Sequence, residues 1–170
     1  MKRTATIFLC ILLVAATAVG CALFSDPFSA DKKTFSSNGM EITLTKAFKE
    51  TSFEGYTVCY DSSKAAVFAL KEEFSLTEGL EALTLEQYHD LVLQANAAKN
   101  PERGENVGSI PTMLYNFYNE EEKTEYRYFA AMYKADDAFW IVQFACEEDL
   151  FDTYEPYFVE AAKTVVFQTA

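Results

Sequence analysis

Residues 138–146 read Ala-Phe-Trp-Ile-Val-Gln-Phe-Ala-Cys. This stretch is almost wholly apolar, so a β-strand formed from it presents apolar side chains on both of its faces. A strand of that kind belongs in the middle of a sheet that is covered on each side. Residues 65–70, Ala-Ala-Val-Phe-Ala-Leu, have the same character and indicate a second interior strand.

Further strands are predicted around these two. Asn38-Gly39 accepts the positive φ of a tight turn, and apolar and polar residues alternate after it. Residues 34–44 are therefore expected to form a hairpin. Other strands are expected over residues 56–60, 112–118 and 124–134, with residues 164–168 as a short extended tail.

Two helices complete the predicted set of elements. Thr84 and Gln87 have capping-box spacing, and apolar residues then recur every three or four positions, which predicts a helix over residues 84–98. A second helix is expected from about Thr153 to Lys163, because Pro156 fits only a first turn. This order of elements predicts an α+β fold. We expect an antiparallel sheet of about six strands with helices on both faces, a three-layer sandwich.

Three segments resemble the PsbP-like family of α/β/α sandwich domains: residues 38–44, residues 138–144, and residues 154–158 together with 162–167. The resemblance spans about residues 35–167 and implies the fold just described. The family includes the extrinsic subunit of photosystem II, a Ran-binding import factor and many bacterial lipoproteins without assigned function. Its members share no catalytic activity, so the resemblance carries no functional residue onto this chain.

Residues 1–20 resemble a bacterial lipoprotein signal. Lys2 and Arg3 precede an uncharged apolar run over residues 7–18, which is shorter than the ~20 residues that a membrane-spanning helix needs. Small residues then precede Cys21, which would be lipidated and become the first residue of the mature chain, although Ala18 stands where such signals usually have Leu. The alternative is ordinary signal-peptidase cleavage near Ala18 or Gly20, with Cys21 an incidental thiol.

These features predict a signal peptide over residues 1–20, a tether over 21–33 and a single α+β domain over 34–170. The expected location is the cell membrane, with the domain lipid-anchored and facing the extracytoplasmic side. The formal net charge is −12 at pH 7, which argues against nucleic acid as a partner and against an anionic lipid surface holding the domain itself. Contact with the membrane is therefore expected through the N-terminal lipid.

The sequence contains few candidate catalytic side chains. His89 is the only histidine in the sequence, and its position beside Tyr88 predicts a side chain that faces water. Cys59 and Cys146 lie in predicted strands and are either bridged as a disulfide or buried as free thiols. No cofactor and no metal is expected, since the acidic clusters at residues 72–73, 120–122 and 147–149 lack the spacing of a calcium loop.

The main functional prediction is a non-enzymatic, lipid-anchored binding or accessory domain of unknown ligand. The alternative is an envelope hydrolase or thiol-redox protein that uses Cys59 or Cys146. A polar loop over residues 101–109 is expected to border a cleft for a small ligand or an envelope protein. The candidate ligand surface comprises Glu102, Arg103, Glu105, Asn106, Tyr115 and Tyr118. The tyrosines at 126, 128 and 133 are either a further binding surface or cross-strand packing.

Overall fold

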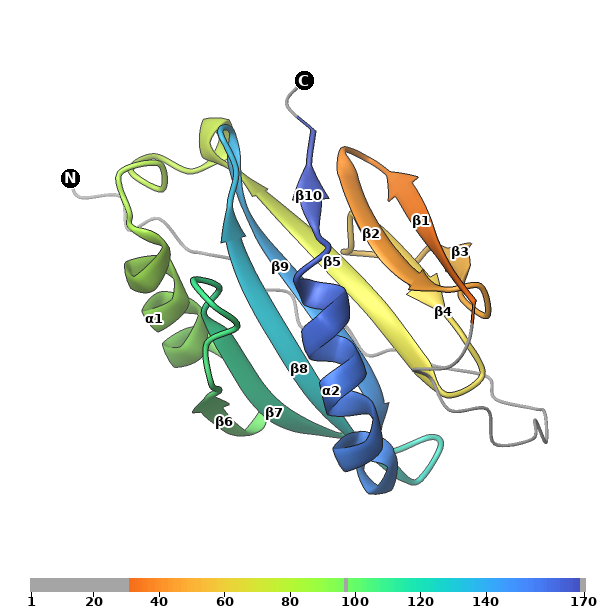
Figure 1. Cartoon of the computed structure of the whole chain (residues 1–170). Helices are drawn as coiled ribbons and strands as arrows, with labels where there is room; N and C mark the ends of the chain where they lie inside the picture. Colours follow the sequence, from red (N-terminus) through yellow and green to blue (C-terminus); the bar gives the residue numbers. More distant parts are fainter. Residues whose placement is uncertain (1–30, 97, 169–170) are drawn as a thin grey trace.

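The computed structural model describes residues 31–96 and 98–168. The predicted signal peptide over residues 1–20 and Cys21 lie outside the described residues, as does most of the predicted tether. Figure 1 shows a long twisted sheet with helix α2 laid across one face and a small second sheet beside α2 on the same face.

The described part of the chain contains ten strands, two α-helices and two short 3₁₀ turns. In chain order they are β1 (Lys32–Ser37), β2 (Met40–Thr45), β3 (Lys49–Thr51), β4 (Val58–Asp61), β5 (Ala65–Glu73), η1 (Phe74–Leu76), α1 (Leu85–Ala95), β6 (Lys99–Arg103), β7 (Thr112–Asn119), β8 (Thr124–Lys134), β9 (Ala138–Glu147), η2 (Glu148–Leu150), α2 (Phe151–Ala162) and β10 (Val166–Phe167).

The larger sheet has seven strands in the order β3-β4-β5-β9-β8-β7-β6, and each neighbouring pair is antiparallel. The two stretches predicted to be interior strands, β5 and β9, lie side by side in its middle. Most side chains of β9, and those of Val67, Phe68 and Ala69 in β5, are buried on both faces of the sheet because other elements cover each face. The antiparallel α+β architecture is therefore confirmed.

The second sheet has three strands in the order β1-β2-β10. The predicted hairpin is present, and Asn38 and Gly39 occupy its turn with φ values of +47° and +84°. Strand β2 buries Met40, Ile42 and Leu44 in the same apolar cluster as α2. The expected number of about six strands was too small. The second sheet was not predicted as a separate sheet, and together with α2 it covers a face of the large sheet that a helix alone was expected to cover.

The two helices pack into different apolar clusters. Phe158 of α2 stacks on Phe144 of β9, with ring centroids 5.4 Å apart. Tyr88 of α1 stacks on Phe139 at the start of β9, with ring centroids 4.0 Å apart, in a cluster formed by the opposite face of the sheet. Neither helix, nor any other in the described segments, is long and apolar enough to span a bilayer.

The stretch predicted to be an irregular loop begins instead with strand β6, the edge strand that pairs with β7. A register shift between Lys99 and Glu102 accommodates Pro101, and Asn100 has a φ of +53°. Proline lacks a backbone donor, so an edge strand at a bulge is where a sheet tolerates it. Helix α1 accordingly ends at Ala95, earlier than predicted.

Two other boundaries differ from the prediction. Helix α2 begins at Phe151 rather than Thr153, so Pro156 lies beyond the first turn. The N–H that proline lacks would have bonded the carbonyl of Asp152, which is exposed, so water can replace that bond. Lys32 and Lys33, expected in the tether, form the start of β1.

Candidate functional site

An aromatic pocket opens on the face of the large sheet that carries α1. Its floor is formed by Ala66 of β5 and Ala145 of β9, which are paired directly across the two strands. In the same row across the sheet, Asp61 of β4 lies beside Ala66, and Tyr128 of β8 lies beside Ala145. Two methyl groups between larger side chains leave a hollow that is open to solvent. We call this hollow the alanine pocket.

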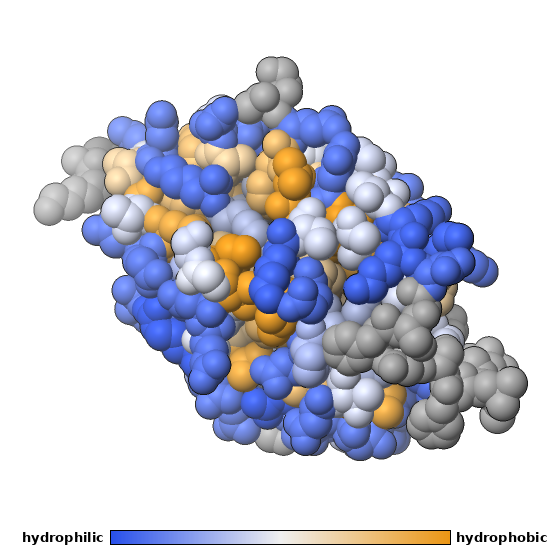
Figure 2. Space-filling view, in the orientation of Figure 1, coloured by the Kyte–Doolittle hydropathy of each residue, from blue (hydrophilic) through white to orange (hydrophobic). Residues whose placement is uncertain are grey.

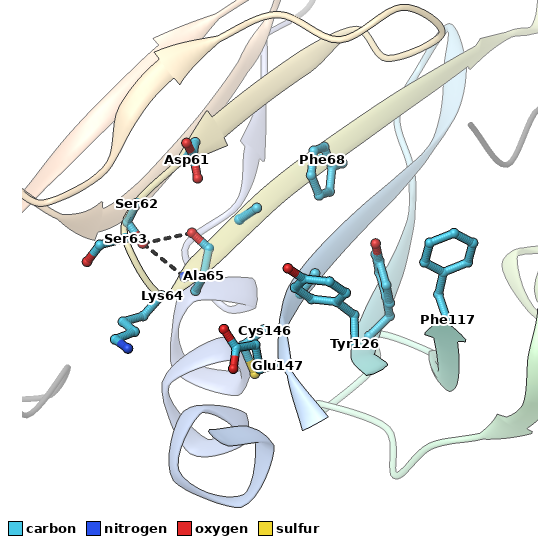
Figure 3. Close-up of a pocket in the computed structure, with 13 residues that line it drawn as sticks. Asp61, Ser62, Ser63, Lys64, Ala65, Phe68, Phe117, Tyr126, Cys146 and Glu147 are labelled. Carbon is cyan, nitrogen blue, oxygen red and sulfur yellow. Dashed lines mark hydrogen bonds between the residues drawn. The ribbon is translucent and has the colours of Figure 1, made fainter. Parts of the chain in front are cut away.

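The walls of the alanine pocket differ in chemistry. Phe117 and Tyr126 are paired across β7 and β8 and form an aromatic wall. The turn from Asp61 to Lys64 lies across the pocket from them, and Glu147, the cross-strand partner of Tyr126, lies between (Figure 3). The pocket therefore presents ring surface on one side and charged groups on the other.

Hydrogen bonds hold both walls in place. The Tyr126 hydroxyl donates to Oε2 of Glu122 at 2.7 Å, which fixes the orientation of that ring. The Ser62 hydroxyl donates to the carbonyl of Ala65 at 2.7 Å and accepts from the Ala65 N–H at 3.1 Å, as the dashed lines of Figure 3 show. Burial raises the pKa of Asp61, partly offset by the N–H of Ser62. Because the aromatic ring and the turn are both anchored, the pocket is preformed.

Tyr115, which was predicted to contact ligand, is instead buried beneath this region. Its ring stacks on Tyr128 with centroids 4.6 Å apart, and its hydroxyl donates to Gln143. Burial raises the pKa of Tyr115 well above its ordinary value. Tyr118 is three residues further along the strand and so points to the opposite face, where it is exposed. The two tyrosines therefore do not border one cleft.

Three other predicted residues do meet, in a groove between β6 and α2. Glu102, Arg103 and Glu105 line it together with Glu155 and Glu160. Its apolar lining includes Leu114, Phe129 and Val159, and Figure 2 shows apolar side chains beside α2 among hydrophilic ones. Two arginines at this edge are already paired with carboxylates. Arg103 donates to Glu86, at 3.1 Å, and to Asp90, while Arg127 donates to Glu102 at 3.1 Å. Asn106 is exposed and is not among the groove's lining residues.

The disulfide considered for Cys59 and Cys146 does not form, and both thiols are free and buried. Cys59 packs in the cluster on the α1 face, whereas Cys146 packs in the cluster on the α2 face. Their strands, β4 and β9, are also separated by β5. Burial raises the pKa of the Cys59 thiol, and burial with the nearby Asp149 and Glu147 raises that of Cys146 to about 12. Neither thiol is therefore a ready nucleophile at neutral pH.

The prediction that His89 faces water was wrong, since its side chain is 0% exposed. Its Nε2–H donates to the carbonyl of Thr112 at 2.9 Å, while Nδ1 finds no partner in the described part of the chain. Strand β6 lies beside α1 on this side, and its Arg103 bridges to the helix, which encloses the histidine. Burial, then the positive charge of Arg103, lowers the pKa of His89.

The acidic clusters serve structural contacts. Glu72 accepts a hydrogen bond from the Tyr88 hydroxyl at 2.9 Å, and Glu148 accepts one from Asn116 at 2.8 Å. Within residues 31–96 and 98–168, no three His, Cys, Asp or Glu side chains gather in a way that could hold a metal ion.

The sequence shows the aromatic residues of the alanine pocket but not the pocket itself. Tyr126 and Tyr128 had been considered as a surface, and Tyr133, which belongs to the same strand, donates instead to the carbonyl of Ala162 on the other face. The deciding feature is the pairing of Ala66 with Ala145, which depends on the register between two strands distant in sequence. A hollow of this kind becomes visible only once that register is known.

Comparison with known proteins identifies the fold. No family model matches the chain, and no curated protein sequence matches it either. The solved structure of the cyanobacterial PsbP protein CyanoP from Synechocystis sp. PCC 6803 is similar, with a TM-score of 0.53 at 12% identity over 89% of this chain and 98% of that one. The Ran-binding protein Mog1p of Saccharomyces cerevisiae is also similar, with a TM-score of 0.53 at 10% identity over 82% of this chain and 96% of that one.

A protein of Bacteroides thetaiotaomicron VPI-5482 matches with a TM-score of 0.52 at 14% identity. The match covers 81% of this chain and 48% of that one, so this chain corresponds to about half of that protein. At these identities the likeness concerns architecture, and it agrees with the resemblance found in residues 38–44, 138–144, 154–158 and 162–167. The chain has the PsbP-like fold.

Proposed function

We propose that this chain is a lipid-anchored, extracytoplasmic binding or accessory domain that holds its ligand in the alanine pocket and performs no catalysis. The observation that carries the proposal is the pocket itself, a preformed hollow with an apolar floor and a few polar groups at its rim. Ligand sites in proteins commonly have this composition, because apolar surface supplies affinity and a few polar groups supply orientation.

The alternative of a hydrolase or thiol-redox protein finds less support in the side chains. Cys59 and Cys146 are buried with raised pKa values, and His89 is occupied by the carbonyl of Thr112. A nucleophile needs an adjacent base or a lowered pKa to be reactive. The similar fold of Mog1p, whose name describes it as Ran-binding, also agrees with a binding role.

Anchoring is proposed through Cys21, on the basis of the signal-like sequence before it. Cys21→Ser is expected to leave unprocessed precursor and to abolish incorporation of a labelled fatty acid by cells. A conservative control is Cys10→Ser, which lies within the apolar run and should leave labelling unchanged. Labelling that persists in Cys21→Ser would show that the lipoprotein assignment is wrong.

Ligand binding can be tested in living cells with the full chain. A photoreactive phenylalanine analogue at Phe117 places a crosslinker in the aromatic wall of the pocket, and the same analogue at Ser36 on exposed β1 is the control. We expect a covalent adduct from position 117 and not from position 36. Adding Ala66→Leu fills the hollow and should abolish the adduct. If position 117 yields no adduct, or if Ala66→Leu leaves it unchanged, the pocket is not the binding site.

A further inference from the structure

We infer that the alanine pocket selects a small organic cation, one whose positive charge is attached to an apolar body, as in a quaternary or aromatic ammonium compound. This inference rests on the proposed function, since it names the class of ligand that the same pocket would take. Three properties of the pocket support it: its aromatic wall, its balance of charge and its apolar floor.

The aromatic wall favours a cation. Phe117 and Tyr126 are each partly exposed in the pocket, and Tyr128 closes its base. The face of an aromatic ring carries partial negative charge, so a cation within about 6 Å of the ring centre is attracted to it. The hydrogen bond from Tyr126 to Glu122 holds one of these rings in a fixed orientation before any ligand arrives. The wall therefore offers a prepared cationic subsite.

The charges around the pocket point the same way. Asp61 and Glu147 line it, and among its described lining residues Lys64 alone carries positive charge. The charged residues that line the pocket thus carry an excess of one negative charge. The whole chain has a formal net charge of −12, which raises the local concentration of cations near its surface. An anionic ligand would meet repulsion both at the rim and from the protein as a whole.

The floor of the pocket is unsuited to metal cations. Ala66 and Ala145 offer methyl groups and no oxygen ligands, and a metal ion requires several oxygen atoms converging on one point. No such convergence of His, Cys, Asp or Glu side chains occurs in the described ranges. An organic cation instead loses little by entering, because its apolar body replaces water against the alanines while its charge stays near Asp61 and Glu147.

The test compares three probes that share a benzene ring and differ in charge, by isothermal titration calorimetry with the full chain in a nonionic detergent. Benzyltrimethylammonium is the cation, benzyl alcohol the neutral analogue and benzoate the anion. We expect benzyltrimethylammonium to bind about tenfold more tightly than benzyl alcohol, with no saturable binding of benzoate. Equal or tighter binding of either other probe, or no binding of the cation, overturns the inference.

Charge variants show whether the rim is responsible. The double variant Asp61→Asn with Glu147→Gln should weaken binding of the cation by about fivefold or more, because each carboxylate at a partly exposed rim contributes about two- to fivefold. Glu78→Gln with Glu81→Gln changes the net charge equally at exposed positions outside the pocket and should have little effect.

Lys64→Gln should strengthen binding of the cation by about twofold, since it removes the opposing charge. The inference is contradicted if the affinity for the cation is unchanged in the Asp61→Asn, Glu147→Gln double variant, or if it falls in Lys64→Gln. These outcomes are separate from the crosslink at Phe117. An adduct at that position together with no preference for the cation would leave the binding role standing and remove only the cation selectivity.

Discussion

Acidification should destabilise this protein through a single buried histidine. His89 is fully enclosed, donates through Nε2 to Thr112 and leaves Nδ1 without a partner in the described residues. Protonation would place a positive charge at Nδ1, away from water and near Arg103. The carboxylates Glu86 and Asp90 favour the charged form, but burial is the largest influence, and the pKa of His89 is lowered from 6.5.

The sign of the effect follows from that direction. A histidine in the unfolded chain takes up its proton near pH 6.5, whereas the folded chain takes up the same proton only at lower pH. Between those two values the unfolded state binds one more proton than the folded state, so acid favours unfolding. The free energy of unfolding should therefore fall as the pH drops below 6.5, by up to about 1.4 kcal/mol per pH unit for this one proton.

His89→Gln is the matched variant, because the glutamine Nε2 can still donate to Thr112 but cannot ionise. Urea unfolding at pH 7.5, 6.0 and 5.0 gives the free energy of unfolding of both proteins. Near pH 7.5 the two should differ by about 1 kcal/mol or less, and the wild type should lose stability relative to the variant on acidification. Asp61 and Glu72, whose pKa values burial raises, titrate in both proteins and cancel in the difference. Parallel pH profiles would refute this account of His89.

Two further predictions concern the core and the thiols. Phe158→Ala should reduce the free energy of unfolding by about 3–5 kcal/mol, because its ring is 0% exposed and packs against Phe144. Leu76→Ala, at a side chain that is 80% exposed, should change it by about 0.5 kcal/mol or less in the same urea titration. In a chain with both N-terminal cysteines changed to serine, a thiol reagent should leave Cys59 and Cys146 unmodified in the native protein and modify both in denaturant. Fast reaction of either thiol in the native protein would restore the thiol-redox alternative.

The interior strands could be predicted because their evidence is local. Residues 65–70 and 138–146 are apolar on both faces, and a strand with that pattern can lie only in a covered sheet interior. The Asn38-Gly39 turn and the capping box of Thr84 with Gln87 were equally local, and both are present in the structure. In each case the residues that determine the structure lie within a few positions of one another.

The features that were missed depend on partners distant in sequence. His89 is buried on the side of α1 where β6 lies. Strand β6 was not predicted, because the Asn100-Pro101 pair follows a helix and a proline in that position usually indicates a loop. The alanine pocket requires the register of β5 against β9 and of β9 against β8, and no short stretch of sequence contains it. Tyr115 was assigned to a ligand surface because tyrosine is common at interfaces, whereas its stacking partner Tyr128 accounts for it.

Binding in the alanine pocket is tested most directly by an NMR titration of the isotope-labelled protein with benzyltrimethylammonium, because this titration locates the binding site as well as detecting binding. We expect saturable shift changes at the backbone amides of Ala66, Tyr126 and Ala145, which surround the alanine pocket. We expect no change at Leu114 and Val159, in the groove beside α2. Changes centred on that groove, or small changes spread over the whole surface, would contradict the assignment of the alanine pocket as the ligand site.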